Sequence, residues 1–471
     1  MAADAATSGT SLVSVGNSAL FQQANSEYLS KTPGSAGNRK LWTYSIWFYK
    51  VDPVVPLAQQ FLHGYVSSGD GGTTLAINAD DEFYMQSDGS FQAETTAIFR
   101  DIGWYHIVFG MDAANTTCSI EVNGVAQTLT GTFPSDTDYA INNNTLQAIG
   151  RYSGGGTPTN YLDGYQAETV FIDGTLYTAT DFGEFDSTGL FWTPKSSAEI
   201  KALTFGTNGF YLDNTTNAQT DASGNGNNWT NNNTVTTTST NTPTNSQNLF
   251  SPLWPSATST VTFSNGNKTF AATGGNTATC NRIGVSLPFP GSGKWIMGVS
   301  QTAVNDTGKS FGVWTDLDNK IGFPPESGAK YGGWYVSSVT NLYDDAGGYI
   351  INLTGNEAAD QFWMAVDVDA GKSFAGYWDN SASTITWYAQ DAGTDGNPAT
   401  GDNPLDTGLS LEGKFFACCS LNSKPLTIVE EADIPFTVPS GYNFLSTTNI
   451  AAETTRTASD TTKYFDTILY E

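Results

Sequence analysis

Hydrophobic and polar residues alternate along most of the chain. Between residues 42 and 49, Trp, Tyr, Ile and Phe at the even positions alternate with Thr, Ser, Trp and Tyr. Residues 105–111 repeat this pattern, and residues 118–122 lead through Asn123-Gly124 into a returning run at residues 125–129. A period of two is that of a strand with one buried face, and Asn-Gly between two such runs favours a tight hairpin. The pattern predicts an all-β protein of antiparallel, jelly-roll-like β-sandwiches.

Two segments depart from this alternation. Residues 196–203 read as a short helix with Ser196 or Ser197 at its N-cap. Residues 213–250 are dominated by Asn, Thr and Ser around the large side chain of Trp229, a composition that cannot bury a core of its own. We interpret this second stretch as a connector between two sandwiches. The expected organisation is an N-terminal arm (1–16), a first sandwich (17–212), the connector (213–250), a second sandwich (251–450) and a C-terminal tail (451–471).

The charge balance excludes two classes of partner. The 471-residue chain has 46 Asp and Glu against 19 Lys and Arg, a formal net charge of −27. A chain this acidic repels phosphate backbones and anionic membrane surfaces, so neither nucleic acid nor a membrane is an expected partner. The sequence also holds no stretch of about 18 apolar residues, which argues against membrane insertion.

Few residues are suited to catalysis or to transition-metal binding. The four cysteines have no paired metal-ligand spacing, which favours free thiols and folding in a cytoplasm. The two histidines, His63 and His106, leave little for histidine-based chemistry, and neither Gly-Lys-Ser segment (308–310, 371–373) has the earlier Gly of a phosphate-binding loop. The nearest approach to a glycosidase acid pair is Glu184-Phe185-Asp186, and no third acid follows it. We expect no enzymatic activity, with a glycoside hydrolase as the remaining catalytic alternative.

One loop has the beginning of a calcium-binding pattern. Asp221, Ser223 and Asn225 place side-chain oxygens at alternate positions, and Gly226 permits the sharp turn that such loops need. The twelfth position is Asn232 instead of a bidentate Glu, so Ca²⁺ would bind weakly. The alternative is a run of Asx turns, in which the same side chains accept hydrogen bonds from the loop's own amides. The predicted metal ligands are therefore Asp221, Ser223 and Asn225, and no other cofactor is expected.

Aromatic residues of the second half are candidates for sugar binding. A flat ring can stack on the apolar face of a pyranose, and the candidates are Trp314, Trp334, Tyr335 and Trp378. The alternative is that these rings belong to the core, as most aromatic residues of a β-sandwich do.

Several motifs in a fixed order resemble known families. In the first half these motifs are residues 104–109, 120–124, 162–165 and 171–176, and in the second half they are residues 293–295, 366–372 and 436–442. The first half resembles the laminin-G/concanavalin-A-like lectin–glucanase superfamily, and the second half resembles a SPRY-type sandwich. The segments 28–43, 221–230, 242–245 and 463–470 are similar to proteins of tailed phages and prophages.

The resemblance implies a structural virion protein of a tailed phage, made in the host cytoplasm and exposed on the particle surface. It implies a fibre- or spike-type appendage that adheres to host glycans and contacts other virion proteins. The alternative is a capsid or tail decoration protein with a purely structural role. The families have no agreed catalytic residues, so none are transferred. Because ordering the polar connector costs about 1–2 kcal/mol per residue, neighbouring subunits are expected to hold it, which predicts a homo-oligomer.

Overall fold

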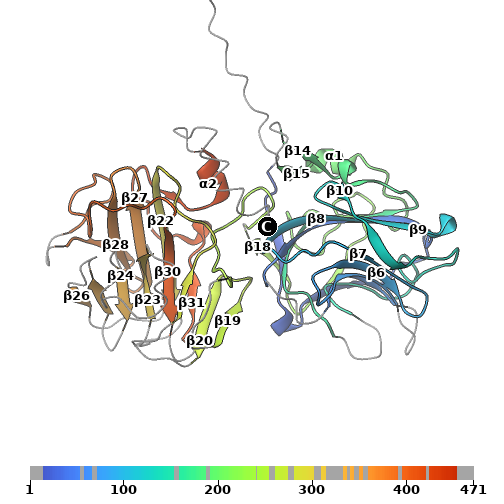
Figure 1. Cartoon of the computed structure of the whole chain (residues 1–471), viewed down its shortest axis with the longest axis horizontal. Helices are drawn as coiled ribbons and strands as arrows, with labels where there is room; N and C mark the ends of the chain where they lie inside the picture. Colours follow the sequence, from blue (N-terminus) through green and yellow to red (C-terminus); the bar gives the residue numbers. More distant parts are fainter. Residues whose placement is uncertain are drawn as a thin grey trace, which may run out of the picture. The chain divides into compact units, whose positions relative to one another are not determined.

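The computed structural model is nearly all β (Figure 1). The chain divides into two compact units between Ser246 and Gln247, and every strand pairing described in them is antiparallel except one. The residues that the structure describes are 14–52, 58–65, 72–152, 159–186, 191–239, 241–253, 260–273, 281–301, 309–314, 333–336, 340–343, 349–353, 359–390, 395–420 and 424–452.

Two sheets form the first unit. Sheet A runs in the order β10 (Val125–Ala126), β9 (Thr117–Val122), β8 (Gly103–Asp112), β3 (Leu41–Lys50), β13 (Gly164–Asp173), β1 (Ser18–Phe21) and β18 (Thr236–Ser239), and β16 (Phe210–Leu212) also pairs with β13. Sheet B runs in the order β11 (Leu129–Thr132), β7 (Phe91–Thr95), β6 (Phe83–Ser87), β5 (Thr73–Ile77), β4 (Gln59–Gly64), β12 (Gln147–Ile149), β2 (Tyr28–Lys31) and β17 (Thr230–Asn232).

The core of the first unit lies between these sheets. Trp42, Tyr44, Ile46 and Phe48 of β3 are fully buried, as their alternation predicts. Phe48 meets Phe61 of β4 edge to face, with ring centroids 5.0 Å apart. Because side chains of both inner faces pack into one cluster, the unit is a β-sandwich, which confirms the predicted fold class.

A second, smaller core covers the outer side of sheet A. It is formed by the hairpin of β14 (Gly183–Phe185) and β15 (Trp192–Pro194) together with helix α1 (Ser197–Lys201), which Figure 1 shows near β8 and β10. The predicted helix is present, and Ser196 is its N-cap in a reciprocal capping box with Glu199. The alternation alone indicates one buried face of β3, but both faces are buried. On the outer face, Trp47 packs with Val15 and Ala167, and Trp192 of β15 lies against this cluster.

The Asn-Gly hairpin is confirmed, but its returning run is divided between the sheets. Val125 pairs with Val122, and both turn residues have positive φ, 48° at Asn123 and 79° at Gly124. Strand β10 ends at Ala126, and Leu129 pairs with Thr95 of sheet B. The prediction of one continuous returning strand was wrong because the chain crosses from one sheet to the other.

The expected connector belongs to the first unit. Residues 230–232 form β17, which pairs with β2, and residues 236–239 form β18, which pairs with β1. Trp229 is only 6% exposed and packs on Phe210, with ring centroids 5.1 Å apart. The polar stretch thus borrows the core of the sandwich instead of forming one, and the unit boundary lies after residue 246. The need for a neighbouring subunit to order this stretch no longer supports a homo-oligomer, which stays a prediction.

The described end of the N-terminal arm also packs on the first unit. The amide of Val15 donates to the Thr244 hydroxyl at 3.0 Å, and its side chain contacts Trp47 and Ala167. Residues 1–13 and 453–471, which include most of the predicted tail, lie outside the described residues.

The second unit also contains two sheets. Sheet C runs in the order β19 (Thr260–Ser264), β20 (Thr269–Thr273), β31 (Leu426–Ile428), β22 (Lys294–Gln301), β27 (Gln361–Asp367), β28 (Lys372–Asp379) and β29 (Thr384–Tyr388), with β32 (Asn443–Phe444) parallel to β22. Sheet D runs in the order β21 (Asn281–Gly284), β30 (Phe415–Ser420), β23 (Lys309–Trp314), β24 (Gly333–Val336), β25 (Thr340–Tyr343) and β26 (Tyr349–Leu353). Helix α2 (Thr447–Ala452) follows β32 and was not expected. Within the described residues, no helix is long and apolar enough to cross a membrane.

Candidate functional site

The outer face of sheet B carries the most unusual set of polar side chains in the first unit. Strand pairing places His63 beside Thr74, and Gln60 in one row with Ala76 and Tyr84. Residues that follow β12 and precede β13 add to this face because they contact its side chains. We define the outer face of sheet B by Tyr28, Gln60, His63, Thr74, Tyr84, Asp88, Arg151, Tyr152 and Tyr161.

Tyrosine rings and one guanidinium group form the middle of this face. The Cζ atom of Arg151 lies 3.8 Å from the ring centroid of Tyr28, and Tyr161 lies 6.2 Å from the same ring. Tyr152 donates from its hydroxyl to Asp88 at 3.1 Å. These three tyrosines are half-buried, so each combines a packed edge with surface that is open to solvent.

Buried polar atoms without partners lie on the same face. His63 is fully buried, its Nδ1 lies 2.9 Å from the Thr74 hydroxyl, and its Nε2 has no hydrogen-bond partner. Burial, reinforced by the charge of Arg151, lowers the pKa of His63 to about 4, so the ring is neutral at pH 7. Gln60 Oε1 and Arg151 Nε are also buried and unpaired. Such groups normally cost stability unless a ligand or water satisfies them.

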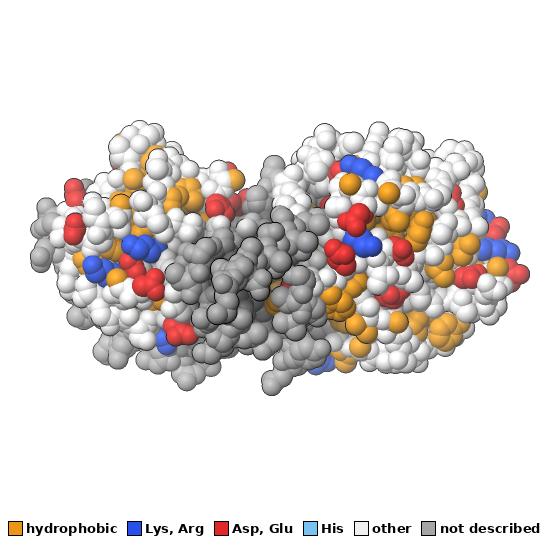
Figure 2. Space-filling model, turned by 90° about the horizontal axis from the view of Figure 1, so that it is seen from above, with side chains coloured by type: hydrophobic (Ala, Val, Ile, Leu, Met, Phe, Trp, Pro, Cys, Tyr) orange, Lys and Arg blue, Asp and Glu red, His pale blue; other side chains and the backbone are white. Residues whose placement is uncertain are grey.

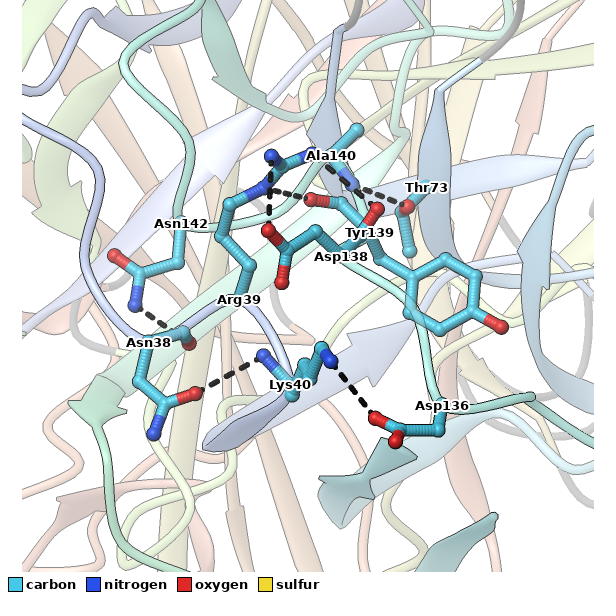
Figure 3. Close-up of polar contacts among 9 residues, drawn as sticks. All are labelled: Asn38, Arg39, Lys40, Thr73, Asp136, Asp138, Tyr139, Ala140 and Asn142. Carbon is cyan, nitrogen blue, oxygen red and sulfur yellow. Dashed lines mark hydrogen bonds and ion pairs between the residues drawn. The ribbon is translucent and has the colours of Figure 1, made fainter. Parts of the chain in front are cut away.

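At the rim between the two sheets, by contrast, the polar groups have hydrogen-bond partners. Asp173 accepts hydrogen bonds from the backbone of Asn38 and from the side chain of Asn142, at 2.7 and 2.6 Å. The neighbouring cations also have partners: in Figure 3, Arg39 is directed at Asp138 and Lys40 at Asp136. A small pocket opens at this rim, lined by Lys31, Ile141, Asn142, Phe171, Asn208 and Trp229. Because its polar groups satisfy one another, we read this rim as a structural clasp between loops.

A comparison with protein families identifies the fold of this unit. Residues 23–180 match a laminin G family model described as the Concanavalin A-like lectin/glucanases superfamily. The first unit has a concanavalin A-like fold. The prediction for the first half is confirmed at the level of fold, whereas phage origin and a virion role stay predictions.

Solved structures were also compared with the whole chain. A candidate carbohydrate binding protein from Bacteroides ovatus is 16% identical with a TM-score of 0.36, over 49% of this chain and 61% of its own, which is less than two thirds. The SPRY domain of human HERC1 is 13% identical with a TM-score of 0.24, over 38% of this chain and 96% of its own. Tailspike protein 2 of the Escherichia coli O157:H7 bacteriophage CAB120 is 12% identical with a TM-score of 0.24, over 38% of this chain and 28% of its own. At these values the likenesses carry no argument about function, and no curated protein matches the chain.

The aromatic residues predicted as sugar platforms lie in the second unit, outside the concanavalin A-like unit. Trp334 is fully buried, and its Nε1 donates to the carbonyl of Trp363 at 3.2 Å. Trp378 is 7% exposed and packs against Phe436. Neither ring presents a free face to a sugar. Trp314 lies in β23 and Tyr335 in β24, and their side chains lie outside the described residues.

The predicted calcium loop of the concanavalin A-like unit forms Asx turns. The Asp221 carboxylate accepts from the amides of Tyr211 and Ser223, both at 2.9 Å, and from that of Asn227 at 2.7 Å. Ser223 Oγ accepts from the amide of Asn225, whose side-chain nitrogen donates to the carbonyl of Gly209. This is the alternative arrangement considered for the loop. Across the described residues, no three His, Cys, Asp or Glu side chains gather as metal ligands.

The calcium hypothesis has a direct test in thermal unfolding. If Asp221, Ser223 and Asn225 hold Ca²⁺, binding to the folded state raises the melting temperature by mass action. The expected result is a higher melting temperature in millimolar Ca²⁺ than in chelator, lost in Asp221→Asn. Equal melting temperatures in the two buffers contradict calcium binding and leave the Asx turns as the whole role of this loop.

The two carboxyl groups considered for hydrolysis have different surroundings. Glu184 is exposed on β14, whereas Asp186 accepts from the amide of Phe191 at 3.1 Å. A buried acid, Glu168, lies at a β-bulge in β13 with φ of 49° and accepts from the Tyr211 hydroxyl. Glu168 is 8% exposed, and burial raises its pKa to about 7. Sequence alternation gave no signal for Glu168, because a bulge interrupts the period of two.

Glu168 is expected to make the first unit less stable as pH rises. Between pH 4.5 and 7 the unfolded carboxyl is ionised while the folded one keeps its proton, so unfolding releases a proton. The free energy of unfolding therefore falls across this window, by up to about 3 kcal/mol. Glu168→Gln should flatten this pH dependence in urea titrations. Part of the dependence should remain, because burial also raises the pKa of Asp163 to about 7. An unchanged slope in Glu168→Gln, matching that of the exposed control Glu184→Gln, contradicts the assignment.

Sequence reasoning missed the residues of the outer face of sheet B. Tyr28 stands at an outward position of β2, where the pattern carried a signal. A register shift between Gln60 and Leu62 interrupts the period of two in β4, so the pattern gave no signal for Gln60. Arg151 and Tyr152 follow a Gly in a segment without periodicity, so nothing in the pattern linked them to Tyr28. Only the pairing of β12 with both β2 and β4 brings these segments together.

Proposed function

We propose that this protein is a glycan-binding appendage on the surface of a tailed-phage particle, and that the outer face of sheet B is its binding surface. The observation that carries the proposal is the group of half-buried tyrosines beside buried polar atoms that lack partners. Sugars offer both an apolar ring face for stacking and hydroxyl groups for hydrogen bonds, which matches this mixture. The concanavalin A-like fold supports the proposal, although a fold alone does not assign a function.

The surface composition supports a polar ligand class such as glycans. On the face in Figure 2, uncharged polar side chains and backbone predominate, hydrophobic side chains form several patches, and acidic and basic groups form scattered spots. The net charge of −27 disfavours nucleic acid and anionic membranes as partners. Other virion proteins and further copies of the chain are the remaining partners that we expect.

Binding of the purified protein to an array of bacterial capsule, lipopolysaccharide and cell-wall oligosaccharides tests this proposal. We expect binding to at least one glycan and loss of that binding in Tyr161→Ala, because Tyr161 supplies an accessible ring of the face. Phe185→Ala is the matched control, since Phe185 is an exposed aromatic residue on β14, outside sheet B. Binding that Phe185→Ala abolishes and Tyr161→Ala leaves intact would place the site elsewhere.

A decoration protein is the alternative role. If the protein neither binds the array nor competes with phage adsorption, while particles that lack it lose stability, adhesion fails and decoration remains. We also propose that the protein is not an enzyme. Release of reducing sugars from a bound polysaccharide, lost on Glu184→Gln or Asp186→Asn, would instead assign a glycoside hydrolase.

A further inference from the structure

Two cations are buried in the described part of the chain, and their surroundings differ. Lys50 is paired with Asp81 at 2.8 Å and donates to the carbonyl of Arg100 at 3.0 Å. Arg151 is 8% exposed, and no described residue forms an ion pair or hydrogen bond with its guanidinium group. A buried charge without a partner is costly, and proteins rarely keep one unless it serves a ligand.

Carboxylates near Arg151 are engaged by other groups. Asp88 accepts from the Tyr152 hydroxyl, and Glu27, which is 2% exposed, accepts from the amide of Gln22 and the side chain of Asn25. The protein has more than twice as many acidic as basic residues, so an unpaired arginine is not explained by a shortage of carboxylates. The contact that holds Arg151 is the stacking of its guanidinium on Tyr28 at 3.8 Å, which leaves the planar fork of N–H donors unused.

A second unused group lies within the electrostatic reach of Arg151. The charge of Arg151 contributes to the low pKa of His63, and the Nε2 of this buried ring has no partner. In the tautomer whose Nδ1 accepts from the Thr74 hydroxyl, 2.9 Å away, Nε2 carries the proton of the neutral ring. Arg151 thus places unused hydrogen-bond donors on the outer face of sheet B, next to Tyr28. His63 lies beside Tyr152, and its Nε2 is fully buried against Gly72.

We propose that the guanidinium group of Arg151, beside His63, forms an anion subsite that takes the carboxylate of an acidic sugar, such as a uronic or sialic acid. This inference rests on the proposed function and specifies its ligand class. The guanidinium fork matches a planar carboxylate in two parallel hydrogen bonds, and the half-buried tyrosines are placed to contact the sugar ring. The carboxylate of the ligand then forms the ion pair with Arg151 that no described carboxylate of the protein forms.

Matched pairs of oligosaccharides test the subsite. The probes are oligogalacturonate and oligosialate, each with its methyl ester, plus a neutral and a sulfated oligosaccharide, and calorimetry measures their affinity. We expect at least one acid to bind about tenfold or more tightly than its ester, because the ester loses the charge-assisted hydrogen bonds. Arg151→Gln should bind acid and ester alike, and Arg151→Lys should restore part of the preference for the acid. Arg151→Gln should not lower the melting temperature, since it removes an unpaired buried charge.

The two histidines provide an internal control by NMR. Binding of the acid should shift the imidazole signals of His63 and raise its pKa, because a carboxylate stabilises the protonated ring. The signals of His106 should not move, since its Nδ1 accepts from Trp192 and its Nε2 lies 2.9 Å from the Ser45 hydroxyl, away from sheet B.

Several outcomes would overturn the subsite. These are equal affinity for acid and ester, a preference for the acid that survives in Arg151→Gln, binding of the sulfated probe alone, or a shift of His106 without one of His63. If only neutral glycans bind, and Tyr161→Ala abolishes that binding, the subsite is wrong while the proposed function stands. If no glycan binds at all, both are wrong.

Discussion

Replacing Trp229 with alanine is expected to lower the free energy of unfolding of the first unit by about 3–5 kcal/mol. Trp229 is 6% exposed and belongs to the cluster between sheets A and B, where it packs on Phe210. Removing the indole leaves a cavity that strand β17 and its neighbours fill only in part, because β17 is held in register with β2. Urea unfolding measures the change in free energy, and calorimetry separates the transitions of the two units.

The control for this prediction is Ile98→Ala. Ile98 is 50% exposed in the same unit, so its truncation should change stability by less than about 0.5 kcal/mol. If residues 213–246 were a connector with no share in the core, both variants would have the same small effect. That result would contradict the assignment of this segment to the first sandwich.

Replacing Asp81 with asparagine is expected to be as damaging, by about 3–5 kcal/mol, for an electrostatic reason. The side chains of Lys50 and Asp81 are 1% and 6% exposed, and Nζ lies 2.8 Å from Oδ1. Burial lowers the pKa of Lys50 and Asp81 counteracts this shift, so Asp81→Asn leaves a buried charge without its partner. Asparagine keeps the size of the side chain and tolerates the positive φ of 64° at this position, so backbone strain does not add to the loss.

The exposed ion pair at the rim supplies the comparison. Lys40 and Asp136 are as close as the buried pair, at 2.7 Å, but their side chains are 34% and 62% exposed. Because solvent screens such a pair, Asp136→Asn should shift the urea midpoint far less than Asp81→Asn does. Similar losses in the two variants, measured as the shift in urea midpoint, would show that burial does not determine the strength of these pairs.

The strand pattern was predictable to the extent that one face of each strand meets the core. The alternation at residues 42–49 predicts a strand, and the structure has one at Leu41–Lys50. The Asn123-Gly124 turn was predictable because only residues that tolerate positive φ suit such a hairpin. The segment 213–246 was misread because its composition was judged alone, whereas its few apolar side chains are buried by strands distant in sequence.

The candidate site was much less predictable than the fold. The calcium pattern at Asp221, Ser223 and Asn225 consists of side chains that serve turns and metals equally well, and only their hydrogen bonds distinguish the two uses. The aromatic residues Trp334 and Trp378 are indistinguishable in composition from exposed rings, and their burial depends on which elements cover them.

The amino-acid sequence by itself determined the local structure: period-two strands, positive-φ turns, the capped helix at Ser197–Lys201 and an acidic, polar surface. Each of these follows from composition or from interactions within a few residues, so it can be predicted without knowing which distant segments pack together. Only the tertiary structure decided that Arg151 stacks on Tyr28 and that the donors of Arg151 and His63 stay unpaired. Whether a polar atom has a partner depends on strands brought together from distant parts of the chain, and that pairing is set by the packing of the whole sandwich.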